Sequence, residues 1–172
     1  VALVANIAEG YNSRLKESKI SVGKDHTCAI NKNGAIDCFG SDKNGKSNGW
    51  KPRFPKTGKG RSVFTQVDVF TDHTCGLSFD GAIECFGDWE GLDPQWPSEG
   101  GRYVHLSTGP GKTCGVTDSG SIQCLGLKPL IIRPVVGEKF TQVSVGTGQF
   151  CGLVSDGTIY FYGYDHTQPT IK

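Results

Sequence analysis

The sequence has no methionine and no long apolar run. Its apolar stretches, such as Val1–Ala5, are a few residues long, whereas a membrane-spanning helix needs ~18 or more in succession. We therefore expect no membrane span. The net charge is only +1 over 172 residues, so no overall positive charge draws the chain to nucleic acid. A chain that starts at Val1 is expected to be processed or a fragment, and removal of a secretory signal peptide is one explanation.

The signatures of common catalytic sites are also missing. There is no Gly-x-Ser-x-Gly, phosphate-binding loop, His-Glu-x-x-His or EF-hand pattern, and no Cys-x-x-Cys. The carboxylates are scattered, and no spacing brings two of them together for acid–base chemistry. We expect no enzyme activity, no cofactor and no metal site.

Glycine and cysteine are abundant, with 25 and 7 residues, and they follow a repeat. One unit of fifteen residues occurs four times, at His26–Gly40, His73–Gly87, Lys112–Gly126 and Gln149–Gly163. A short apolar segment precedes each unit, at Phe64–Val69, Tyr103–Thr108 and Phe140–Val145, with a weaker version at Ile20–Val22. Alternating apolar positions around Asn-Gly, Asp-Gly or Ser-Gly predict a β-hairpin in every unit, so the chain is predicted to be all-β.

The hairpin turns also predict which cysteines face each other. With Gly34 in the left-handed conformation, Ile30 faces Ile36 and Cys28 faces Cys38. The same register in the next two units, together with a cross-strand separation near that of a disulfide, predicts three bridges. These are Cys28–Cys38, Cys75–Cys85 and Cys114–Cys124.

Two other interpretations of the six cysteines stay open at this point. They could be buried free thiols, which are common in protein cores, or zinc ligands, although a spacing of ten is wide for a structural zinc site. Cys151 has Phe161 at its partner position, so it is predicted to be an unpaired thiol: either a small buried apolar residue or the site of an intermolecular disulfide or a covalently attached group. His26 and His73 have Lys112 and Gln149 at the same position, which favours a structural role over a repeated metal site.

Both faces of each hairpin carry apolar residues, so each must be covered on both sides. Ala29, Gly76, Gly115 and Gly152 are small residues on the face opposite the cysteines. Sheets stacked around an axis, and repeat arrays in general, meet this requirement.

The second unit shows the pattern most fully, with His73, Thr74 and Cys75 before the turn and Ile83 and Cys85 after it. It resembles the repeat of the regulator of chromosome condensation superfamily, and the resemblance extends from about Lys19 to Gly163. Phe39, Phe86, Leu125 and Tyr162 stand where that family usually has tryptophan. The resemblance implies a β-propeller, typically of seven blades. The paired cysteines resemble those of exported or extracellular members, and the short spacing is similar to the propeller-type β-lactamase inhibitor branch.

Four units make about half of such a propeller. We therefore expect β-propeller-type blades built from about four short antiparallel repeats, as a partial ring or one completed by a second chain. Residues 1–18 are expected to be an N-terminal strand or linker, and residues 19–172 the propeller-like domain. Its units are placed at about 19–63, 64–102, 103–139 and 140–172.

The longer connectors between the units are candidate binding segments. Residues 1–63 hold 12 Lys and Arg against 5 Asp and Glu, whereas residues 64–172 hold 6 against 12. The connector Asp42–Arg61 accounts for most of the basic excess, and it either binds a polyanion or an acidic protein or is a solvated, mobile loop. Its candidate binding residues are Lys43, Lys46, Trp50, Lys51, Arg53, Lys56, Lys59 and Arg61. The connector Asp88–Glu99 is acidic and carries Trp89 and Trp96, which either anchor a partner or cover their own blade.

These features predict a secreted, extracellular or organelle-lumenal protein that works by binding. The first hypothesis is a non-enzymatic scaffold module whose connector loops contact proteins, through self-association or as a subunit of a larger complex. The alternative is a lectin-like or inhibitor-like module that binds a glycan or a protein loop. Nucleotide-exchange or chromatin activity, as in the founding family member, is disfavoured by the paired cysteines and the small net charge.

Overall fold

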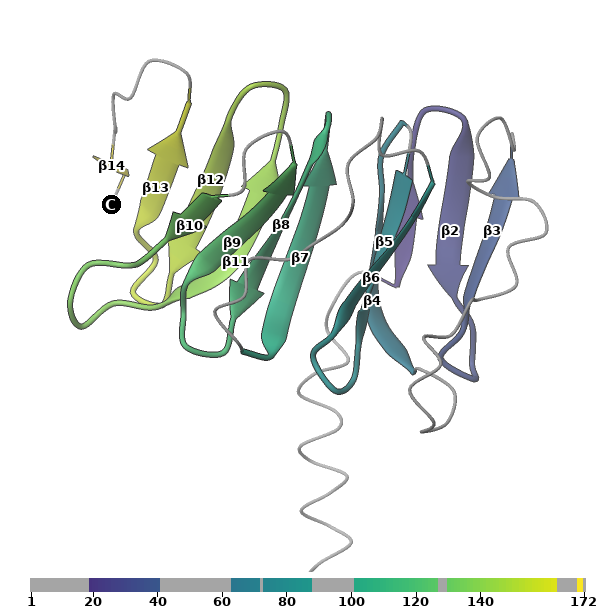
Figure 1. The fold of residues 1–172 in the computed structure, drawn as a ribbon, viewed down its shortest axis with the longest axis horizontal. Coiled ribbons are helices and arrows are strands. Elements are labelled where there is room, and N and C mark those ends of the chain that lie inside the picture. The colour runs from purple at the N-terminus through teal and green to yellow at the C-terminus, as the bar shows by residue number, and fades with distance from the viewer. Residues whose placement is uncertain are drawn as a thin grey trace, which may run out of the picture.

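A computed structural model describes residues 19–40, 63–71, 73–87, 101–126, 130–163 and 170–171. These residues form four small antiparallel sheets, which we call blades one to four (Figure 1). Each blade is a meander in which the strands pair in chain order. The described part of the chain contains no helix, in agreement with the all-β prediction.

The first two blades have three strands each. Those of blade one are β1 (Ile20–Val22), β2 (His26–Ile30) and β3 (Ile36–Gly40). Those of blade two are β4 (Phe64–Val69), β5 (His73–Ser78) and β6 (Ile83–Gly87).

The last two blades have four strands each. Those of blade three are β7 (Tyr103–Gly109), β8 (Lys112–Thr117), β9 (Ile122–Gly126) and β10 (Leu130–Ile132). Those of blade four are β11 (Phe140–Val145), β12 (Phe150–Val154), β13 (Ile159–Tyr162) and β14 (Thr170–Ile171).

The turn chemistry of the sequence explains the register of the hairpins. Gly34 has a φ of 75°, in the left-handed region that favours glycine, and the corresponding Gly81, Gly120 and Gly157 have φ of 86°, 88° and 92°. In the first turn the Asn31 side chain accepts hydrogen bonds from the backbone N–H groups of Asn33 and Ala35. These turns place Ile30 opposite Ile36 and Cys28 opposite Cys38, as predicted.

The register brings the paired cysteines together in three blades. Cys28–Cys38, Cys75–Cys85 and Cys114–Cys124 are disulfides, with Cα–Cα distances of 4.1, 4.0 and 4.0 Å. The six cysteines are therefore oxidised pairs and not free thiols or zinc ligands. Cys151 is the free cysteine, as its unpaired position predicted, and it is half-buried.

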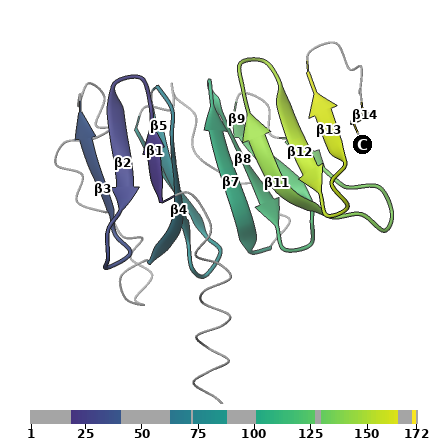
Figure 2. The same cartoon turned by 180° about the vertical axis from the view of Figure 1, so that it is seen from behind.

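The four blades stand side by side in chain order, from blade one at one end to blade four at the other (Figures 1 and 2). The first strands of the blades, β1, β4, β7 and β11, are neighbours across the array. Among the described residues the array is open, so blade one and blade four each have one sheet face with no further described blade against it. This is the partial ring that the number of repeats predicted.

The hydrophobic core lies between blades. Each of its three clusters combines one face of a blade with the opposite face of the next blade. The first cluster, for example, joins Cys28 and Ile36 of blade one to Phe64, Val67 and Val69 of blade two. We call the cysteine-bearing face of a blade its forward face, the opposite face its rear face, and the packed contact between two blades a seam.

Candidate functional site

Each seam is formed by an isoleucine that packs against a glycine of the next blade. An ideal Cβ atom placed on Gly76 would lie 2.5 Å from the Cδ1 atom of Ile36, and one on Gly115 would lie 2.8 Å from that of Ile83. At the third seam, a Cβ atom on Gly152 would lie 2.7 Å from the Cδ1 atom of Ile122. The glycines are needed because the isoleucine occupies the space of a side chain.

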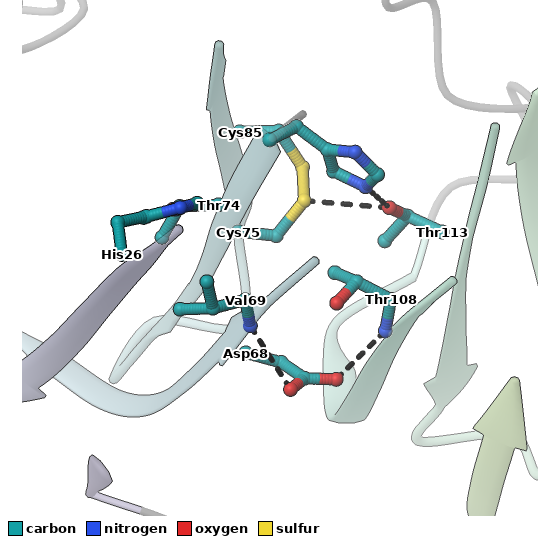
Figure 3. Close-up of a disulfide and its surroundings, with 9 residues drawn as sticks. His26, Asp68, Val69, Thr74, Cys75, Cys85, Thr108 and Thr113 are labelled. Carbon is teal, nitrogen blue, oxygen red and sulfur yellow. Dashed lines mark hydrogen bonds between the residues drawn. A yellow bond between two sulfur atoms is a disulfide. The ribbon is translucent and has the colours of Figure 1, made fainter. Parts of the chain in front are cut away.

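A second seam element satisfies backbone groups along the edges of the first strands. The Oγ atom of Ser21 in blade one accepts a hydrogen bond from the N–H of Val69 in blade two, at 3.1 Å. Its hydroxyl also donates to Asp68 at 2.8 Å. Asp68 in turn accepts the N–H of Thr108 in blade three, at 2.7 Å (Figure 3). Side chains of one blade thus bind backbone N–H groups at the edge of the first strand of the next blade. An exposed strand edge would leave these groups unpaired.

The third seam repeats this arrangement with a serine. Ser107 has the same place in blade three as Asp68 has in blade two, opposite the first cysteine of its hairpin. Its Oγ atom accepts the N–H of Val145, at 3.2 Å. Ser144 has this place in blade four, opposite Cys151.

Gln66 and His105 provide a further bond of the same kind. Gln66 accepts the N–H of Leu106 at 3.0 Å and donates to the carbonyl oxygen of the same residue at 2.8 Å. The Nδ1 atom of His105 accepts the N–H of Val143, at 3.4 Å. Burial lowers the pKa of His105 from its usual 6.5, and the nearby Asp68 carboxylate opposes this only in part. The neutral ring is the form that can accept this bond.

Beside the cysteines, a buried polar pair closes the first two seams. His26 Nε2 lies 2.8 Å from Thr74 Oγ1, and His73 Nε2 lies 2.9 Å from Thr113 Oγ1 (Figure 3). This confirms the structural hydrogen-bonding role predicted for both histidines. At the third seam, Lys112 stands at the histidine position and Phe150 stands at the threonine position. The Nζ atom of Lys112 lies 5.3 Å from the centre of the Phe150 ring.

The two ends of the array carry the unmatched halves of this interface. On blade four the forward face presents Cys151, Ile159 and Phe161, which are half-buried, and the exposed Ser144 and Gln149. Among the described residues, the Ser144 side chain has no hydrogen-bond partner, unlike Ser21 and Ser107 at the same position.

On blade one the rear face is more open. Ile20, Val22 and Phe39 are 61%, 71% and 72% exposed. The corresponding Val67 and Val69 of blade two, which the forward face of blade one covers, are at most 5% exposed. These two end faces are therefore the interaction surfaces that the described residues offer.

The predicted connector sites fall outside the described residues. These are Lys43, Lys46, Trp50, Lys51, Arg53, Lys56, Lys59, Arg61, Trp89 and Trp96. The structure therefore does not test them, and they remain predictions.

No group of three or more His, Cys, Asp or Glu side chains within the described ranges is arranged to hold a metal ion. None of the described segments is a helix of the length and apolarity that crossing a membrane requires.

Tyr103, which lies in the second seam, has a raised pKa. Burial raises the pKa of Tyr103 to about 12, and its hydroxyl donates to Gln123 at 2.6 Å. Gln123 belongs to the same blade, and the Tyr103 ring packs with the second seam. This tyrosine therefore has a structural explanation for its shifted pKa.

Comparison with known proteins agrees with this architecture. A family profile, the Regulator of chromosome condensation (RCC1) repeat, matches residues 18–46. The described blades also superimpose on RCC1-like propellers of known structure. The chain therefore has the blade architecture of RCC1-like propellers. Its paired cysteines are disulfides, in keeping with the resemblance to the paired-cysteine type. No curated protein sequence matches the chain.

Two of the similar structures are plant receptor-kinase ectodomains. The entire ectodomain of the Physcomitrella patens receptor kinase CR4 has a TM-score of 0.67 at 20% identity, covering 87% of this chain and 42% of its own. The CRINKLY WD40 ectodomain of the Arabidopsis thaliana kinase ACR4 has a TM-score of 0.69 at 20% identity, covering 87% and 57%. Prp20p of Saccharomyces cerevisiae has a TM-score of 0.65 at 16% identity, covering 84% and 43%. This chain thus covers about half the length of these similar structures.

Sequence reasoning missed the residues that bridge the blades. Gln66, Asp68, His105 and Ser107 lie on the first strands, in a segment read only as an apolar strand. A usable signal was present in these RCC1-like repeats. Polar residues alternate with buried apolar ones along each first strand, at positions that a strand covered on both faces would leave apolar.

Proposed function

We propose that this chain is a non-enzymatic, protein-binding module of an extracellular or lumenal assembly, and that its connectors contact the partner. The observation that carries the proposal is the set of three disulfides, one in each of blades one to three. Disulfides form and persist in oxidising compartments. The receptor-kinase ectodomains that share the fold support the same setting.

The distribution of ionisable groups supports binding over catalysis. The described groups with shifted pKa values are Asp80, Tyr103, His105, Tyr160 and Tyr162. The lowered pKa of Asp80 is explained by a hydrogen bond from Ser78 in a hairpin turn. The raised pKa of Tyr160 is explained by a hydrogen bond from its hydroxyl to Glu138. His105 and Tyr103 belong to seams. The five groups are divided among blades two, three and four, and are not gathered in one place as the residues of an active site would be.

The chemistry of the connectors identifies the kind of contact. Residues 41–62 join β3 to β4 and carry the excess of lysine and arginine, whereas residues 88–102 join β6 to β7 and are acidic with two tryptophans. A basic segment with Trp50 suits an acidic protein surface, because charge steers the encounter and the indole provides buried area. The similar Prp20p has been studied for its binding to Gsp1p and histones, which are proteins.

The test is cross-linking from the connector in the native extracellular or lumenal fluid. A photoreactive residue at position 50 is expected to capture a defined protein, and the double variant Lys51→Glu and Arg53→Glu is expected to lose it. Val136→Asp is the matched control, because Val136 is fully exposed and belongs to neither connector. Capture that does not respond to the charge reversal would contradict the proposal.

A glycan array with the same proteins tests the alternative. Glycan binding that disappears in Trp50→Ala, Trp89→Ala or Trp96→Ala would support the lectin-like function instead. Acceleration of nucleotide release from a small GTPase by the purified chain would contradict the non-enzymatic assignment.

A further inference from the structure

We propose that the forward face of blade four binds the rear face of blade one of a second copy of this chain. The contact would use the same seam that joins consecutive blades within one copy. This inference goes beyond the proposed function, which concerns the connectors. The end faces consist of strand residues that belong to neither connector, so separate substitutions test the two proposals and each can fail without the other.

The forward face of blade four carries the residues that a seam requires. Ile159 has the position of Ile36, the residue that packs against the glycine of the next blade. Ser144 has the position of Ser21, opposite the first cysteine of the hairpin. Gln149 precedes Phe150 as His26 precedes Thr27, so it stands where His26 meets the threonine of the following blade.

The rear face of blade one carries the matching half. Val22 has the position of Val69, whose N–H is bound by the serine of the preceding blade. Thr27 has the position of Thr74, so it would face Gln149 as Thr74 faces His26. An amide and a hydroxyl can form this bond in either direction. The exposed Ile20, Val22 and Phe39 would be covered in the same contact.

The hairpin turn of blade four has open space where the turns of the other blades contact the next blade. A Cβ atom on Gly34, Gly81 or Gly120 would lie 2.5, 2.6 or 2.7 Å from Val63, Arg102 or Lys139, the residues that lead into the next blade. A Cβ atom on Gly157 would meet nothing within 4 Å. The following blade is thus missing at this turn, within the described part of the chain.

Charge and length favour a second copy as the occupant. Residues 1–63 have a net charge of +7, and residues 140–172, with Asp156 and Asp165 against Lys172, have −1, so contact between opposite ends brings unlike charges together. The similar propeller chains are about twice as long as this chain, so two copies together have the length of one such chain. A head-to-tail contact of this kind closes into a ring if the rotation between copies allows it, and otherwise extends.

Two departures from the repeat lie on the end faces and set the strength of the contact. Ala29 takes the place of Gly76, Gly115 and Gly152, so its methyl group would hold Ile159 away from the sheet. Cys151 takes the place of a bridged cysteine and would lie in the contact as a thiol. We therefore expect the seam between copies to be weaker than the internal seams, and reversible.

The experiment is sedimentation velocity on the full oxidised chain across the micromolar range. The expected result is concentration-dependent formation of dimers or larger species. Val22→Asp on the rear face and Ser144→Arg on the forward face should each weaken association about tenfold or more, while Val136→Asp, also an exposed apolar position, should leave it unchanged. A wild-type chain that stays monomeric at the highest concentration overturns the proposal, as does association that both end-face variants retain.

Mixing separates a head-to-tail contact from a symmetric one. Val22→Asp and Ser144→Arg chains each keep one intact end, so together they should form a one-to-one heterodimer that neither forms alone. No heterodimer, with the melting temperatures of both variants unchanged, counts against the proposal. Ala29→Gly should shift association in the opposite direction and tighten it. Protection of Cys151 from N-ethylmaleimide should rise with protein concentration, and fully concentration-independent labelling would contradict its place in the contact.

Discussion

Replacing Gly76 by alanine tests whether the seams hold the array together. In a strand whose surface is free, alanine is normally favoured over glycine by about 0.5–1 kcal/mol, because glycine loses more conformational freedom on folding. At Gly76 the added Cβ atom would lie 2.5 Å from Ile36 Cδ1 and 2.7 and 2.8 Å from two atoms of the Phe64 ring. Three contacts this short force the seam apart, and such overpacking costs about 1–3 kcal/mol.

The net effect expected for Gly76→Ala is therefore a decrease of about 2 kcal/mol in the free energy of unfolding. This value takes the upper part of the overpacking range and subtracts the preference for alanine. For a chain of this size, this lowers the melting temperature by about 4–8 °C. Calorimetry at low protein concentration measures it. Gly146→Ala is the control, because the nearest atom to its Cβ, the Gln149 carbonyl oxygen, is 3.6 Å away. Ile36→Val removes the Cδ1 atom. The double variant Gly76→Ala with Ile36→Val should therefore lose less stability than the sum of the two single losses.

A neutral or raised melting temperature in Gly76→Ala would refute the reasoning. It would mean that blades one and two are not packed as described, or that the seam yields without cost. A double variant whose loss equals the sum of the two single losses would show that Ile36 and position 76 do not share one contact.

Three further outcomes follow from the disulfides, the buried histidine and the third seam. Dithiothreitol should lower the melting temperature strongly, because closing each loop of this length contributes about 2–3 kcal/mol, and Cys151→Ser should respond as the wild type does. Since burial holds the pKa of His105 below 6.5, the unfolded chain takes up the proton first, and stability should fall as pH drops below about 6.5. His105→Gln keeps an acceptor for the N–H of Val143, and it should weaken the pH dependence of stability measured by denaturant titrations. An unchanged pH dependence would assign the effect to another group. Lys112→His and Phe150→Thr should each destabilise the protein in the same titrations, by roughly 1 kcal/mol or more, and the double variant should recover part of the loss by restoring a His–Thr pair. Strict additivity of the two losses would show that these positions do not interact.

The sequence predicted what is local to one hairpin. Asn33-Gly34 and its counterparts set the turn, the turn sets the register, and the register places Cys28 beside Cys38. Each of these steps involves residues within about ten positions of one another, where turn chemistry decides the geometry. The unpaired state of Cys151 followed from the same argument, because Phe161 stands opposite it.

The contacts between blades could not be predicted in the same way. Period-two alternation shows that Gly76 and Ile36 lie on covered faces, but it does not say that one packs on the other from 40 residues away. Asp68 lies in a segment that was predicted only as an apolar strand, yet its carboxylate accepts bonds that reach blades one and three. The connectors were singled out by composition alone, and charge patterning does not determine a loop conformation.

The placement of the disulfides has a mechanical consequence. Each bridge closes one hairpin, between cysteines ten residues apart, and none of the three joins two blades. Tension applied to the ends of the array would therefore load the seams, which are held by packing and hydrogen bonds, before any covalent bond. The blades should separate one after another, and each of the first three should keep a loop that cannot lengthen. A single-molecule pulling trace would then show short, regular extension steps, and reduction would make each of those steps longer.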